Sequence, residues 1–185
     1  MHIRFRQYRC RRREADSITI FEALEAWKDL LVATAGASAA LAGLVTVAIA
    51  TNIGEILKFP WLPSRAATSI ALLVLVLVVS IAGLMRPQSL FWFGVETVAF
   101  AALTWLITAR TAWIRLATRR VHERPVPQLA QEIGLYQIGV LPFVVGGVLL
   151  LTDDTNGMYW LAGGMIAAVV VSMLTTWVLL IEVLR

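Results

Sequence analysis

Residues Ala66–Met85 read AATSIALLVLVLVVSIAGLM, an apolar stretch without a single charged side chain. About 20 such residues, wound as a helix, cross the hydrocarbon core of a bilayer. Four more apolar stretches flank this one, and all five together contain only two charged residues, Glu96 and Arg110; the other stretches are 30–51, 90–114, 133–151 and 158–181. The sequence therefore predicts an all-α polytopic transmembrane helix bundle of about five spans.

The composition of the chain agrees with a membrane location. Of its 185 residues, 59% are hydrophobic and 15% are charged, against roughly 45–50% and about 25% in soluble domains. We expect a basic N-terminal arm over residues 1–17 and a single transmembrane domain over residues 18–185. This composition excludes a soluble enzyme, a fibrous chain and a disordered chain.

The residue types that carry most enzymatic chemistry are scarce. Cys10 is the only cysteine, His2 and His122 are the only histidines, and none of the three lies in a predicted span. The chain has no metal-binding, phosphate-binding or nucleophile motif such as HExxH, GxGxxG or GxSxG. We therefore expect no enzymatic activity, no cofactor, no metal and no nucleic-acid partner.

The N-terminal stretch MHIRFRQYRCRRR is too polar to pack against other segments. We expect a disordered arm that either contacts anionic lipid or a partner, or serves only as a solvated topology signal. The candidate lipid contacts are its arginines: Arg4, Arg6, Arg9, Arg11, Arg12 and Arg13. From Thr19, apolar and polar residues recur with helical spacing, which predicts an interfacial amphipathic helix leading into the first span.

Small residues at helical spacing mark two spans as packing elements, because small side chains let helix backbones approach closely in lipid. We expect these two spans to form the tight core, packed on each other or on their copies in an oligomer. The large aliphatic second span is expected to face lipid. The packing positions are Thr34, Ser38, Ala42, Gly43 and Thr46 in the first span, and Gly164, Ala168, Ser172 and Thr176 in the fifth.

A polar seam runs along the third span, through Thr97, Thr104, Thr108 and Thr111. This spacing favours a side that faces protein or water, although each hydroxyl alone can simply bond its own helix backbone. In the fourth span, Pro142 and Gly146 can kink the helix. Such a kink serves either as a gate or as ordinary helix packing.

Placing Glu96 within a span costs free energy, because a buried carboxylate must be paired, protonated or hydrated. It is an ion- or proton-handling residue, or its side chain reaches the interface, or it pairs with Arg86. Arg110 follows on almost the same face of the helix, but it lies roughly 21 Å away at 1.5 Å per residue. The two can meet only between the copies of an antiparallel dimer.

The positive charges do not choose an orientation. With five spans, the 16 Lys and Arg residues divide equally between the two faces, and the basic arm lies opposite the basic loop after the third span. Either one of the first three segments does not cross, or the arm is overridden, or the chain inserts both ways. Because the first helix usually dominates, an N-terminus inside is favoured.

The stretch AWKDLLVATAGASAALAGLVTVAIATN, residues 26–52, resembles the opening segment of a group of small, uncharacterised multi-pass bacterial membrane proteins. This resemblance implies the bacterial cytoplasmic (inner) membrane and carries over no activity. We expect a subunit, modulator or scaffold that contacts the lipid bilayer and packs with its own copies or with another membrane protein. The alternative is a small oligomeric ion channel or transporter that uses the polar seam and Glu96.

Overall fold

The computed structural model describes residues 2–56, 62–85, 89–118, 126–152 and 154–184. The described residues form helices joined by short connections, with no strand among them. The helices are α1 (His2–Thr51), α2 (Ile53–Ile56), α3 (Leu62–Leu84), α4 (Leu90–Thr118), α5 (Val126–Leu151) and α6 (Asn156–Leu184). The protein is a helical bundle.

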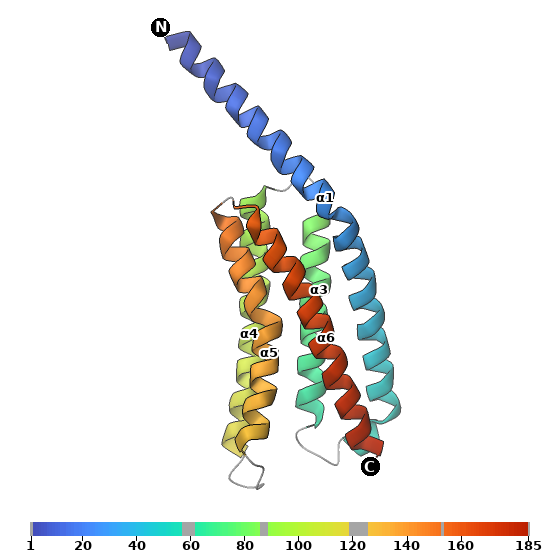
Figure 1. Cartoon of the computed structure of the whole chain (residues 1–185). Helices are drawn as coiled ribbons and strands as arrows, with labels where there is room; N and C mark the ends of the chain where they lie inside the picture. Colours follow the sequence, from blue (N-terminus) through green and yellow to red (C-terminus); the bar gives the residue numbers. More distant parts are fainter. Residues whose placement is uncertain (1, 57–61, 86–88, 119–125, 153, 185) are drawn as a thin grey trace.

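Five of these helices are long and apolar enough to span a membrane. Their apolar portions are Trp27–Thr51, Ala66–Leu84, Leu90–Arg110, Gly134–Leu151 and Asn156–Val178. These bounds confirm the five spans that the composition predicts. The helices run alternately up and down, so the N-terminal part of α1 and the C-terminal end of α4 lie at opposite ends of the bundle (Figure 1).

α1 is longer than the first span requires. Its 50 residues form one helix, and the N-terminal part projects beyond the bundle (Figure 1). Residues 2–17, expected to form a disordered arm, belong to this helix, which has no break between His2 and Thr51. The reason is local: no Gly or Pro precedes Gly36, and arginine is a good helix former. A helix that continues through residue 17 does not by itself place or exclude a boundary there, so the division of the chain at residue 17 stays a prediction, as does the interfacial position of the segment before the first span.

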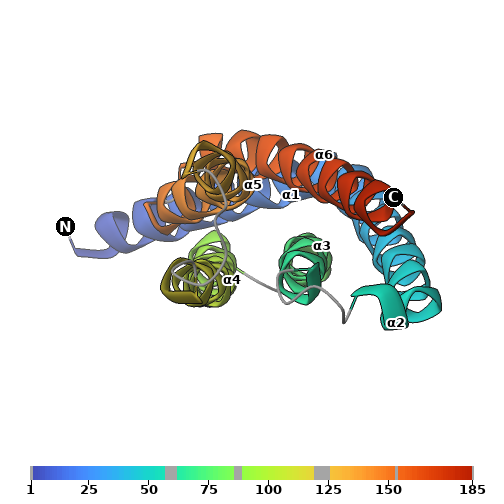
Figure 2. The same cartoon turned by 90° about the horizontal axis from the view of Figure 1, so that it is seen from below.

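The helices form two layers, α3 beside α4 in one and α1, α6 and α5 in the other (Figure 2). α6 packs most extensively on α5, α1 on α3, and α4 on α5, whereas α1 and α6 meet over a shorter stretch. Of the two arrangements expected for the first and fifth spans, packing on each other thus covers only a short stretch, and packing on their copies in an oligomer stays a prediction. α3 lies between them and supplies partners to both, since Ser80 bonds Thr34 of α1 and Ser69 bonds Ser172 of α6.

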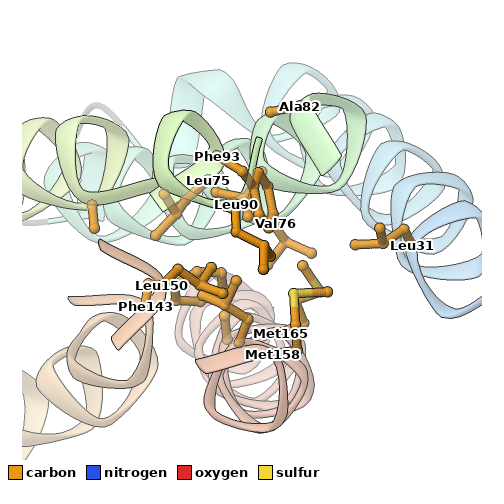
Figure 3. Packing of buried hydrophobic residues seen from close by; sticks show 14 residues of the cluster. Leu31, Leu75, Val76, Ala82, Leu90, Phe93, Phe143, Leu150, Met158 and Met165 are labelled. Atoms are coloured by element: carbon orange, nitrogen blue, oxygen red, sulfur yellow. The ribbon is translucent and has the colours of Figure 1, made fainter. Parts of the chain in front are cut away.

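α3 is also the most buried span, with half of its apolar window inside the bundle. The expectation that this span faces lipid is therefore wrong, because large aliphatic residues suit a protein interior as well as they suit lipid. The core brings together Val76 of α3, Phe93 of α4, Phe143 of α5 and Met165 of α6, with Leu31 reaching in from α1 (Figure 3).

Candidate functional site

The polar seam of the third span faces inward, as predicted. Thr97, Thr104 and Thr108 are buried or nearly so, but each hydroxyl donates to a carbonyl of α4 itself. The acceptors are the carbonyl oxygens of Phe93 at 2.8 Å, Phe100 at 2.9 Å and Trp105 at 2.9 Å, respectively. Own-helix bonds of this kind are ordinary for Thr in apolar helices and need no ligand to explain them. The side chain of Thr111 lies outside the described residues.

Glu96 is the acidic residue whose placement within a span costs free energy, and its surroundings in the structure raise that cost. The residue is half-buried, and its Oε2 atom is fully buried without a hydrogen-bond partner among the described residues. Glu96 follows the start of α4 by six positions, a depth of about 9 Å along the helix axis. Arg86, its expected partner, lies outside the described residues, so that pairing stays a prediction.

Arg110 is exposed on α4, at the opposite end of the same span (Figure 1). α4 packs mainly on α5 and α3, which leaves its outer side open (Figure 2). Leu103, midway between Glu96 and Arg110, is 54% exposed. Glu96 and Arg110 therefore belong to one helix that has an uncovered face.

Glycines bring α4, α5 and α6 into close contact. A Cβ on Gly146 would lie 2.9 Å from the carbonyl oxygen of Gly157, and one on Gly147 would lie 2.7 Å from Cγ2 of Val98. Similarly, a Cβ on Gly94 would lie 3.0 Å from the Gly147 carbonyl oxygen. Helix packing therefore accounts for Gly146, which we had also considered as part of a gate.

Pro142 lies inside α5, which continues through it. The proline ring faces α6, where a Cβ on Gly164 would come within 3.0 Å of the Pro142 Cβ. Ala168, the next small residue of the predicted ridge, is fully buried. Gly164 and Ala168 thus act as packing residues, as the spacing predicts, but toward α5 rather than toward α1.

Two hydroxyl clusters join the helices. The Oγ atoms of Ser69 and Ser172 are 2.7 Å apart, and Oγ1 of Thr176 lies 3.1 Å from Ser69 Oγ. Nearer the other end of the bundle, Oγ1 of Thr34 lies 2.8 Å from Oγ of Ser80. The sequence reasoning identified one side of each cluster and missed Ser69 and Ser80. The available signal was that they are hydroxyl residues in an otherwise aliphatic span.

The predicted ridge of the first span is only partly covered. Ser38 is fully buried, and Thr34 and Ala42 are half-buried. Thr46 is exposed, with its hydroxyl donating to the Ala42 carbonyl oxygen at 2.8 Å. A Cβ on Gly43 would meet nothing within 4 Å. The ridge therefore continues from a buried half into an open half.

The remaining candidates carry less information. The side chains of the arm arginines lie outside the described residues, so their contact with anionic lipid stays a prediction. Within the described part of the chain, no group of three His, Cys, Asp or Glu side chains is placed to hold a metal ion.

The chain was compared with known families and structures. No family model, curated protein or solved structure matches it. The architecture is therefore described from this structure alone: the chain is a five-span helical membrane bundle with an open face on α1 and another on α4.

Proposed function

We propose that this chain is a non-enzymatic subunit, modulator or scaffold of the bacterial cytoplasmic membrane that works by packing against other transmembrane helices. The resemblance of residues 26–52 to small multi-pass bacterial proteins supports the membrane assigned to it. No recognisable nucleophile and base motif occurs in the sequence, which supports a role without catalysis.

The observation that carries this proposal is the open face of α1. Only 17% of its apolar window is buried, the lowest share of the five spans. Its exposed residues include Gly36, Ala40 and Gly43, at the spacing i, i+4 and i+7. Without a hydrophobic driving force between helices in lipid, small residues favour association because they let backbones touch. An exposed row of them suits a partner helix better than it suits lipid chains.

Cysteine crosslinking in native membranes tests the proposal. In a chain carrying Cys10→Ser, we expect Ala40→Cys labelled with a benzophenone maleimide to give a discrete crosslinked species on illumination, whether the neighbouring helix belongs to a second copy or to another membrane protein. Ser38→Cys is the matched control, because Ser38 lies on the same helix but is 0% exposed and should give none. Gly43→Leu should abolish the Ala40 crosslink while leaving the monomer folded, since the added side chain meets no atom within 4 Å of its Cβ. If Ala40→Cys stays monomeric in native membranes, the proposal fails.

A small oligomeric channel or transporter is the second candidate, and the unpartnered Oε2 of Glu96 favours it. A buried carboxyl oxygen without a partner is what a proton or a small cation would bind. Reconstituted vesicles test this function directly. An ion-dependent potential that is lost in Glu96→Gln, with assembly intact, would establish transport. Vesicles that stay tight at every imposed ion gradient would eliminate it.

A further inference from the structure

We propose that the partner of α4 is a second copy of this chain inserted in the opposite orientation, with two reciprocal Glu96–Arg110 ion pairs across the interface. The inference rests on the proposed function and names a partner for it, at a face separate from the small-residue face of α1. Four observations on α4 support it.

The first observation is the unpaired charge. Glu96 is half-buried, and its Oε2, which the single copy itself covers, has no hydrogen-bond partner among the described residues; turning the side chain toward the open face would relieve this costly arrangement. Arg110 is exposed on the apolar span. In a single copy the two residues are separated by roughly 21 Å along the helix. Glu96 and Arg110 can therefore meet only between two copies of the chain.

The second observation is the geometry of the face. Glu96, Leu103 and Arg110 follow one another at intervals of seven residues, which places them on one side of a helix in a left-handed crossing. A two-fold axis through Leu103 brings Glu96 of one copy level with Arg110 of the other. The charges are thus self-complementary only when the two helices run antiparallel, and a parallel pair would set like charges side by side.

The third observation is the shape of the residues between the charges. The same axis sets Ala99 opposite Ile107 and Phe100 opposite Leu106. All four are exposed in the single copy. Ala99 is small and Ile107 is large, so the two can fit together across the interface. This face is also free of other helices, because α4 packs mainly on α3 and α5.

The fourth observation is the balance of positive charge. The N-terminal part of α1 and the C-terminal end of α4 lie at opposite ends of the bundle (Figure 1), and with five spans the 16 Lys and Arg residues divide equally between the two faces. Because no charge bias selects one orientation, insertion of the chain both ways is the alternative that the proposal adopts. Both partners of an antiparallel dimer are then present in one membrane.

Two differently tagged chains, both carrying Cys10→Ser, test the geometry when expressed together. One carries Ala99→Cys and the other Ile107→Cys. We expect oxidation to link the two different chains, because these positions are level in the antiparallel pair. Links between two Ala99→Cys chains or between two Ile107→Cys chains would indicate a parallel pair and overturn the proposal. The absence of any link, while the α1 crosslink persists, would also overturn it. That last result would leave the proposed function standing.

Charge variants test the ion pairs. We expect Glu96→Gln and Arg110→Gln each to reduce the crosslinked fraction by about tenfold, since each leaves one charge unpaired. The double reversal Glu96→Arg with Arg110→Glu should restore crosslinking, which a misfolded chain would not do. Arg65→Gln is the matched control for the orientation balance, because it removes one positive charge near the start of α3, at the same end as Arg110, without touching the α4 face. Unchanged crosslinking in both single variants would overturn the ion pairs.

The native thiol tests the orientation. A membrane-impermeant maleimide applied to intact cells should label about half of the Cys10 thiols, with the rest labelled after permeabilisation. Complete labelling in intact cells, or labelling only after permeabilisation, would mean a single orientation and would overturn the proposal.

Discussion

Gly157 is a residue whose missing side chain determines how closely two helices approach. A Cβ at this position would lie 2.6 Å from the carbonyl oxygen of Gly146, an atom of the backbone. We expect Gly157→Ala to lower the free energy of unfolding by about 1–3 kcal/mol, because α5 and α6 must move apart. Denaturant unfolding in detergent micelles measures this change. Gly36→Ala is the control, since its Cβ meets nothing within 4 Å. Equal stabilities of the two variants would contradict the packing described here.

Ser69 illustrates how a hydroxyl in an aliphatic helix can hold two spans together. Its Oγ lies 2.7 Å from Ser172 Oγ and 3.1 Å from Thr176 Oγ1. We expect Ser69→Ala to destabilise the bundle by about 0.6–2 kcal/mol. Thr46→Ala removes a hydroxyl that bonds only its own exposed helix and should cost less. A double-mutant cycle with Ser172→Ala gives the coupling energy, and a coupling of zero would show that the cluster does not stabilise the packing of α3 on α6.

The helices themselves could be predicted from the sequence far better than their neighbours could. All five spans follow from runs of apolar residues, since length and charge decide whether a helix crosses a bilayer. The central place of α3 could not be predicted, because a Leu- and Val-rich face is equally suited to lipid and to other helices. Spacing identified the small residues of the first and fifth spans, but it did not show that Ser80 and Ser69 of α3 would be their partners.

The candidate site was predictable to a similar degree. Residue type alone shows that burying the Glu96 carboxylate costs free energy, and helical period shows that the Thr residues of the third span share one side. The sequence could not show which carboxyl oxygen lacks a partner or which face of α4 stays open, because both depend on where α3 and α5 pack. The close approach of Gly94 to Gly147 was likewise missed, since a single glycine in a span does not reveal its neighbour.

The N-terminal part of α1 and the bundle together decide how the chain sits in the membrane. Six arginines of the arm supply most of the positive charge on the N-terminal side of the chain. Without them only Lys28 and Arg86 would remain on that side, against eight Lys and Arg on the other. We expect deletion of residues 2–17 to produce a single orientation with the N-terminus outside, because positive loops stay in the cytoplasm.

A thiol in the α5–α6 connection reports the outcome of this deletion, since that connection lies at the same end of the bundle as the N-terminal part of α1 (Figure 1). Thr155 is exposed there, and with residues 2–17 deleted a Thr155→Cys thiol is the only one in the chain. We expect an impermeant maleimide to label this thiol completely in intact cells, whereas Thr155→Cys with Cys10→Ser in the full-length chain should be labelled in about half of the molecules. The deletion should also abolish the Ala99–Ile107 crosslink, because an antiparallel dimer needs both orientations in one membrane. Persistence of that crosslink in a membrane where every chain points the same way would show that the α4 face pairs in some other geometry.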